Sequence, residues 1–179
     1  KGGKYRETVL RRREETLPLV KLCADLIIRW VKLGRHIVLE CQGIFDLPEF
    51  AEVMQLVADG VLYLCTPHGC TLGYKDAESE LPHYKPLKIL TSSIVLADLL
   101  ENRVCPRNHV HQTIEGTNRF GIRSFQSAEW PDELNKLVAL AILQQAEVDR
   151  TSGVLADADA FAGSDDDGVQ RREGRLGVR

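Results

Sequence analysis

One short run restricts the fold of this chain more than any other: His36-Ile-Val-Leu-Glu40, followed by Cys41, Gln42 and Gly43. Its three consecutive aliphatic residues are typical of a strand buried on both faces of a mostly parallel sheet. The run ends at the carboxylate of Glu40, before a glycine and a proline that open a loop. Because ligands of open α/β sheets bind at the carboxyl ends of the strands, we expect Glu40 to face a site. The alternative is a carboxylate that caps the next helix or pairs with an arginine.

The segments around this run predict alternating helices and strands. Apolar residues recur at helical spacing in four segments, 17–33, 46–57, 94–100 and 131–149. Short apolar runs predict three further strands, at 61–65, 70–74 and 87–91. The last of these alternates in polarity, which favours an antiparallel strand near an edge. We therefore predict a three-layer α/β fold with a mostly parallel sheet, one antiparallel hairpin strand and the 36–41 strand at its centre.

Composition and charge patterning predict one domain with polar ends. Residues 1–16 form a charged extension, 17–150 hold the α/β domain, and 151–179 have the composition of a disordered tail. The net charge of -3 indicates that any basic surface is local. No run of about 18 apolar residues occurs, so no membrane partner is expected. Five cysteines, an odd number, fit reduced thiols in an intracellular protein.

The strongest ligand chemistry lies in the segment 103–128, which has no apolar periodicity. Its motif is Cys105-Pro-Arg-Asn-His109-Val-His111. Thiolates and imidazoles are the donors that zinc prefers, and a fourth ligand would come from Cys70 or from the turn 65–68. We expect zinc to be bound by four residues, Cys70, Cys105, His109 and His111. The alternative is a loop with surface histidines and one buried thiol.

Enzyme motifs give little support to a catalytic function. The sequence contains no G-x-S-x-G, no Walker loop and no G-x-G-x-x-G. Cys41 follows a buried strand, where a thiol is more often an inert part of the core than a nucleophile.

The run Ile37-Val38-Leu39-Glu40 is similar to a strand of the DNA cytosine-5 methyltransferases, whose glutamate holds the edge of the target cytosine. The block order from Val61 to Thr91 also resembles the C-terminal half of this class I, S-adenosylmethionine-dependent family. Three segments further resemble a divergent module in polyproteins of retrotransposon-type elements: 70–74, 85–88 and 105–111. Over roughly residues 17–145, the resemblance implies an incomplete Rossmann-like methyltransferase half with Glu40 as its catalytic residue.

The sequence departs from that family in two respects. The cofactor-binding glycine loop and the Pro-Cys nucleophile loop would precede Leu17, and neither is present; Cys41-Gln42 stands where the family has Asn-Val. The chain alone is therefore expected to be inactive. It would be a DNA methyltransferase, with S-adenosylmethionine as cofactor, only if an N-terminal half completed it.

Three functions are compatible with these observations. The first is a nucleic-acid-associated, truncated methyltransferase-like domain of mobile-element origin, whose partner would be that N-terminal half. The second is a zinc-stabilised module that binds DNA or RNA without enzymatic activity, and the third is an interaction fragment with neither property. In the second, four basic residues are expected to face phosphate: Lys85, Lys88, Arg103 and Arg107.

Overall fold

The computed structural model describes residues 2–152, so the predicted disordered tail lies outside the described residues from position 153 onward. The α-helices of this part are α1 (Gly2–Lys32), α2 (Ala51–Ala58), α3 (Ile94–Glu101), α4 (Arg123–Gln126) and α5 (Asp132–Ser152). Two 3-10 helices are η1 (Pro48–Phe50) and η2 (Gly69–Thr71). The strands are β1 (Val38–Glu40), β2 (Tyr63–Cys65), β3 (Ile89–Thr91), β4 (Thr117–Asn118) and β5 (Gly121–Ile122).

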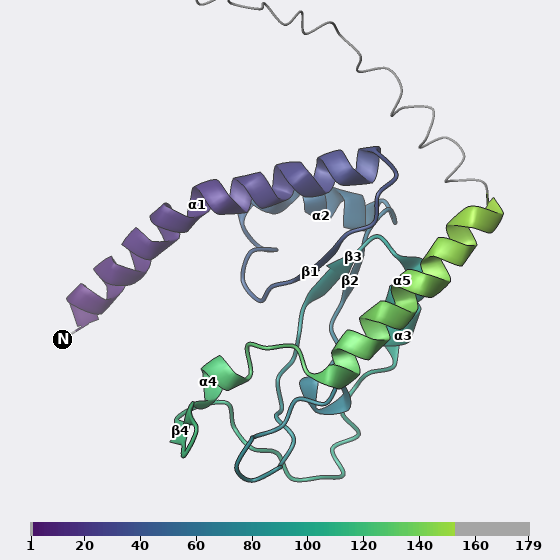
Figure 1. Ribbon diagram of the computed structural model, residues 1–179. Coiled ribbons are helices and arrows are strands. Elements are labelled where there is room, and N and C mark those ends of the chain that lie inside the picture. Colours follow the sequence, from purple (N-terminus) through teal and green to yellow (C-terminus); the bar gives the residue numbers. More distant parts are fainter. Residues whose placement is uncertain (1, 153–179) are drawn as a thin grey trace, which may run out of the picture.

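The main sheet is small and antiparallel. Its order is β1-β3-β2, and both neighbours of β3 run antiparallel to it, with Val38 and Tyr63 each opposite Thr91. Strands β4 and β5 form a separate antiparallel pair (Figure 1). The prediction of a mostly parallel, Rossmann-like methyltransferase half is therefore wrong for the described residues. The prediction that the 36–41 strand is central is also wrong, because β1 lies at an edge.

The burial of the two strands shows why the prediction of a central 36–41 strand is wrong. All three residues of β3 are buried, whereas β1 is exposed at Val38 and half-buried at the next two residues. A run of aliphatic residues is expected both at the centre of a parallel sheet and on an edge strand that a helix covers. The run at 36–41 is of the second kind, since Ile37 packs under α1 just before the strand begins.

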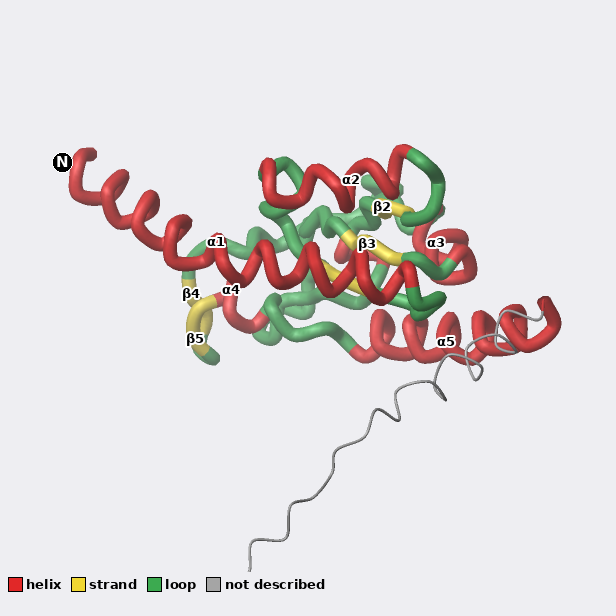
Figure 2. Tube along the Cα trace, turned by 90° about the horizontal axis from the view of Figure 1, so that it is seen from above, coloured by secondary structure: helices red, strands yellow, loops and turns green. Residues whose placement is uncertain are grey.

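Two apolar clusters meet at β3. Leu90 belongs to the cluster beneath α1 and α2, and its neighbour Ile89 belongs to the cluster with α3 and α5. Successive residues of a strand point to opposite faces, so a single strand serves both clusters. Figure 2 shows α2 and α5 on opposite sides of the sheet, with α1 crossing above it.

The helix predicted at 17–33 is confirmed, but α1 begins at Gly2 and so includes most of the predicted charged extension. Its N-terminal part projects beyond the rest of the molecule (Figure 1). Val20, Ala24 and Ile27 are buried, as an amphipathic face should be. Four other large apolar residues of the predicted segment are exposed by 42 to 61%: Leu19, Leu22, Leu26 and Trp30.

Two further local predictions have opposite outcomes. The helix predicted at 94–100 is confirmed as α3, which is capped by Ser93, whose Oγ accepts a hydrogen bond from the Leu96 amide at 3.1 Å. The strand predicted at 70–74 is wrong. That segment forms η2 and a turn, because the Tyr74 amide bonds back to the Gly69 carbonyl and Gly73 adopts a φ of +86°.

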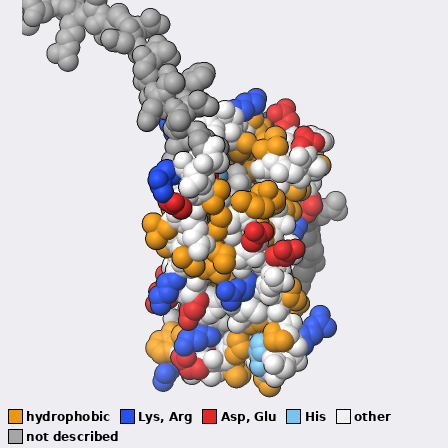
Figure 3. Space-filling model, turned by 90° about the vertical axis from the view of Figure 1, so that its right-hand side faces the viewer, with side chains coloured by type: hydrophobic (Ala, Val, Ile, Leu, Met, Phe, Trp, Pro, Cys, Tyr) orange, Lys and Arg blue, Asp and Glu red, His pale blue; other side chains and the backbone are white. Residues whose placement is uncertain are grey.

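The helix predicted at 131–149 is confirmed as α5, which extends to Ser152. Its exposed side carries hydrophobic residues, among them Leu140, Ile142 and Leu143. Figure 3 views the molecule from the right-hand side of Figure 1, where α5 lies. Hydrophobic side chains lie between charged ones on this face. No helix among the described residues is both long enough and apolar enough to cross a membrane.

Candidate metal centre

The candidate site lies where η2 meets the loop that follows α3. The backbone amide of His68 donates to the Arg103 carbonyl at 2.7 Å. The hydroxyl of Thr71 lies 2.7 Å from the His68 carbonyl and 3.0 Å from the Arg103 carbonyl. These contacts hold the turn that carries Cys70 against the start of the loop that carries Cys105.

The four predicted ligands converge. One donor atom from each of Cys70, Cys105, His109 and His111 lies within 4.8 Å of all the others. The Cys105 Sγ is 3.3 Å from His111 Nε2 and 3.8 Å from His109 Nε2. Bonds of about 2.0 Å to nitrogen and about 2.3 Å to sulfur place tetrahedral ligands roughly 3.3 to 3.8 Å apart. These four side chains could therefore hold a metal ion after only a small closure.

The surroundings of the donors orient them. Cys105 is buried, and its Sγ accepts a hydrogen bond from the Arg107 amide at 3.3 Å. His109 Nδ1 lies 3.1 Å from the side-chain oxygen of Asn108, which leaves Nε2 directed at the sulfur. Hydrogen bonds of this kind fix the orientation of ligands around a metal.

The alternative fourth ligand, in the turn 65–68, is not part of the cluster. His68 Nδ1 accepts a hydrogen bond from the Cys105 amide at 2.9 Å, so this ring supports the loop backbone. Cys65 lies near α3, where burial and then the carboxylates of Glu101 and Asp98 raise the pKa of its thiol. Of the two sources that the sequence left open, the structure brings Cys70 to the donors.

Metal binding at this cluster would require the thiols to lose their protons. Burial, followed by the hydrogen bond to Cys105, raises the pKa of Cys70 to about 11. Burial and the neighbouring rings of His109 and His68 lower the pKa of His111, which favours its neutral form. Neutral imidazoles offer a lone pair directly, whereas each thiol must release a proton when it binds metal.

A pocket of about 360 Å³ opens beside the cluster. It is lined by Tyr84, Arg107, His109 and His111. The Tyr84 ring makes T-shaped contacts with the rings of His68 and His111, with ring centroids 5.1 and 5.3 Å away. Figure 3 shows a histidine side chain at the surface on the lower part of the molecule. Aromatic side chains and a cation thus border the metal ligands on their solvent side.

Glu40, the predicted catalytic residue, lies elsewhere, at the end of β1. Glu40 is half-buried. Burial, followed by the nearby carboxylate of Glu40, raises the pKa of the Tyr74 phenol to about 12. The Tyr74 hydroxyl is buried and has no hydrogen-bond partner among the described residues. Lys85 lies over the Tyr74 ring, and burial lowers the pKa of this lysine while Glu40 opposes the shift.

The four predicted phosphate-binding residues fall into two groups. Lys85 donates to the Ser127 carbonyl at 2.6 Å, and Lys88 lies 3.6 Å from the Asp46 carboxylate, so both are engaged within the chain. Arg103 and Arg107 are exposed and lie on the loop that carries Cys105, although Arg103 Nε also donates to the Leu99 carbonyl at 3.4 Å. Only this second pair is presented to solvent beside the metal cluster.

Sequence reasoning missed several residues that build the site. Tyr84, which lines the pocket, was not predicted at all, and His68 was considered only as a possible ligand and not as the acceptor of the Cys105 amide. Outside the metal cluster, Asp76 joins two loops by accepting hydrogen bonds from Ser79, Asn118 and Arg123. For Asp76 a signal existed, because an aspartate in a polar loop commonly accepts the amide two residues on and closes a turn, as Asp76 does with Glu78.

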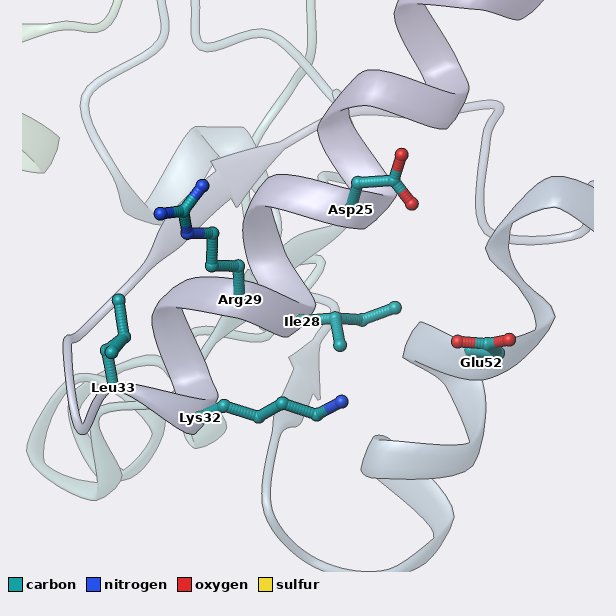
Figure 4. A pocket seen from close by; sticks show the side chains of 6 residues that line it. All are labelled: Asp25, Ile28, Arg29, Lys32, Leu33 and Glu52. Atoms are coloured by element: carbon teal, nitrogen blue, oxygen red, sulfur yellow. The ribbon is translucent and has the colours of Figure 1, made fainter.

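A second pocket, of about 380 Å³, lies between α1 and α2 (Figure 4). Its lining is Asp25, Ile28, Arg29, Lys32, Leu33 and Glu52. Figure 4 shows Lys32 extending towards α2, which carries Glu52, while Arg29 points away from that helix. Charges of both signs line this pocket without converging, so we assign it no ligand.

No family model, no curated protein and no solved structure matches this chain. Its function is therefore argued from the geometry and chemistry of the site.

Proposed function

We propose that this chain is a zinc-stabilised nucleic-acid-binding module without enzymatic activity of its own. The observation that carries the proposal is the convergence of Cys70, Cys105, His109 and His111. Two thiolates and two imidazoles form a donor set that zinc prefers over the hard cations, which select oxygen ligands. Two thiolates also balance the charge of the cation, and this favours a structural role over a catalytic one.

The methyltransferase-like alternative has less support. That alternative requires a mostly parallel sheet in which Glu40 ends a central strand and faces a ligand site. In the structure, β1 is instead an edge strand of an antiparallel sheet. Glu40 lies near Tyr74, which is buried, and near Lys85, which is half-buried. S-adenosylmethionine, expected only for a complete parent protein, is therefore not part of the proposal.

The need for a metal follows from the loop itself. Residues 102–116 contain no helix or strand, and Val104 and Val110 are exposed, so burial contributes little to ordering this segment. Ordering the backbone costs about 1 to 2 kcal/mol per residue. A structural zinc site contributes on the order of 10 kcal/mol, enough to offset much of that cost.

Nucleic acid as the partner rests on Arg103 and Arg107. Both lie exposed on residues 102–116, here called the metal loop. An arginine guanidinium matches the geometry of a phosphate. The net charge of the chain is -3, so binding depends on this local patch and should weaken steeply with salt.

The proposal is tested by elemental analysis of the purified full chain. We expect about one equivalent of zinc, and a loss of nearly all of it in Cys105→Ser, because three ligands bind far more weakly than four. The matched control is Cys23→Ser. Cys23 packs against the apolar cluster beneath α1 and α2 and is not a metal ligand, so this substitution should leave the zinc content unchanged. Less than about a tenth of an equivalent in the unmodified chain would contradict the proposal.

A further inference from the structure

The pocket beside the metal cluster combines an aromatic ring with a free cation. Tyr84 is 41% exposed, and Arg107 lines the same pocket. The volume of about 360 Å³ falls within the range of small-molecule sites, roughly 300 to 1,000 Å³. The pocket is therefore large enough for one unstacked nucleotide of a longer strand.

The Tyr84 ring is held in place before any ligand arrives. His68 and His111 make T-shaped contacts with it, with interplanar angles of 70° and 67°. The preceding residue, His83, is buried, and its Nδ1 lies 3.0 Å from the Gln112 carbonyl, which anchors this segment to the metal loop. A ring already fixed by packing loses little conformational entropy when a base stacks on it.

The guanidinium of Arg107 is available for an anion. Within the part of the chain that the structure describes, it forms no ion pair and donates no side-chain hydrogen bond, unlike Arg123, which binds Asp76. The backbone of Arg107 adopts a φ of +56°, and its amide binds the Cys105 sulfur. The metal loop thus fixes the backbone from which the guanidinium extends into the pocket.

We infer that this pocket binds one unpaired nucleotide of a single-stranded nucleic acid, with its base on Tyr84 and its phosphate on Arg107. The inference rests on the proposed function and narrows the ligand from nucleic acid in general to a single strand with an unpaired nucleotide. Aromatic side chains and arginines are what single strands use for binding, because their bases are free to stack. In a duplex the bases are already stacked on one another, so only the phosphates would be available to this site.

The test is fluorescence anisotropy of the full, zinc-loaded chain with labelled single strands of DNA and of RNA, and with the matching DNA duplex. We expect either single strand to bind more tightly than the duplex. Tyr84→Ala should weaken single-strand binding by about ten-fold or more, as loss of a stacked base does elsewhere. Tyr84→Phe keeps the ring and should bind like the unmodified chain.

Two controls separate this inference from the function it rests on. Arg107→Ala should weaken binding, whereas Arg150→Ala, an exposed arginine on α5, should not. The zinc content of each variant shows whether its loop is intact. Equal binding of duplex and single strand, with no effect of Tyr84→Ala, would overturn the nucleotide pocket but leave a phosphate-binding module. No binding by a fully zinc-loaded chain would overturn both the pocket and the nucleic-acid function.

Discussion

A single carboxylate, that of Asp76, joins two loops that have little regular structure. One oxygen accepts hydrogen bonds from the Ser79 amide at 2.9 Å and from the Glu78 amide at 3.1 Å. The other accepts from Asn118 at 3.0 Å and from the Arg123 guanidinium at 2.9 Å. The side chain is buried, so an uncompensated charge here would be costly, and these donors compensate it.

The same contacts predict a pH dependence of stability. The hydrogen bond from the Ser79 amide, followed by those from Arg123 and Asn118, holds the pKa of Asp76 well below its usual range, although burial acts in the opposite direction. A carboxyl with a lowered folded-state pKa stabilises the fold above the unfolded-state pKa of about 3.9, and this contribution is lost as the pH falls further. Asp76→Asn should therefore destabilise the chain near neutral pH, and the difference should shrink below about pH 4.

Urea unfolding of both proteins across this pH range measures the effect. The control is Asp98→Asn, because Asp98 is exposed on α3 and should show little difference at any pH. If the two asparagine variants lose the same stability at every pH, Asp76 does not have the role that we assign to it.

At the scale of elements, a buried polar network fastens α5 to the rest of the fold. Gln145 is 6% exposed; its carbonyl oxygen accepts from the Ser93 hydroxyl at 2.8 Å, and its amide donates to Asp149 at 2.9 Å. Asp149 in turn lies 2.8 Å from His36 Nε2. The network connects α5 to the cap of α3 and to the segment before β1.

Removing the central amide should leave its partners unsatisfied. We expect Gln145→Ala to lower the free energy of unfolding by about 1 to 3 kcal/mol, the usual cost of a buried polar group without a partner. Gln144→Ala is a matched control, since Gln144 is the adjacent residue and is exposed. Chemical denaturation of the three proteins measures both effects. A loss for Gln145→Ala no larger than for the control would show that the network contributes nothing.

The main helices and the positions of three strands could be predicted from the sequence, but the pairing of the strands and the short helix α4 could not. Helical spacing locates α3 and α5 because it is a local property of about 3.6 residues per turn. The position of β1 depends on which strands pair with it, and a run of aliphatic residues carries no information about its partners. The exposed side of α1 was likewise beyond prediction, because Leu19, Leu22 and Trp30 fit a buried face until the other elements are placed.

For the site, the sequence predicted the donors but not their surroundings. Cys105, His109 and His111 are close in the chain, so their chemistry is visible as a motif. Cys70 was one of two candidates, and only the folded arrangement distinguishes it from the turn at 65–68. Tyr84 lies more than twenty residues before the motif, and no local pattern connects the two.

At the scale of the whole molecule, the two apolar clusters cover both faces of β3 but leave the loop after α3 without a core of its own. Among the described residues, Cys105 is the only residue of this loop whose side chain belongs to the buried apolar set. We therefore expect the metal centre to order this loop and with it the aromatic pocket and the exposed arginines.

X-ray absorption at the zinc edge of the purified full chain tests this claim most directly, because it reports the identity of the ligand atoms. Four ligands from two cysteines and two histidines should give two sulfur atoms at about 2.3 Å and two nitrogen atoms at about 2.0 Å. Cys70→Ser should replace one sulfur by a lighter atom. A first shell of nitrogen and oxygen alone in the unmodified chain would contradict the account, because the cation would then not be held by Cys70 and Cys105.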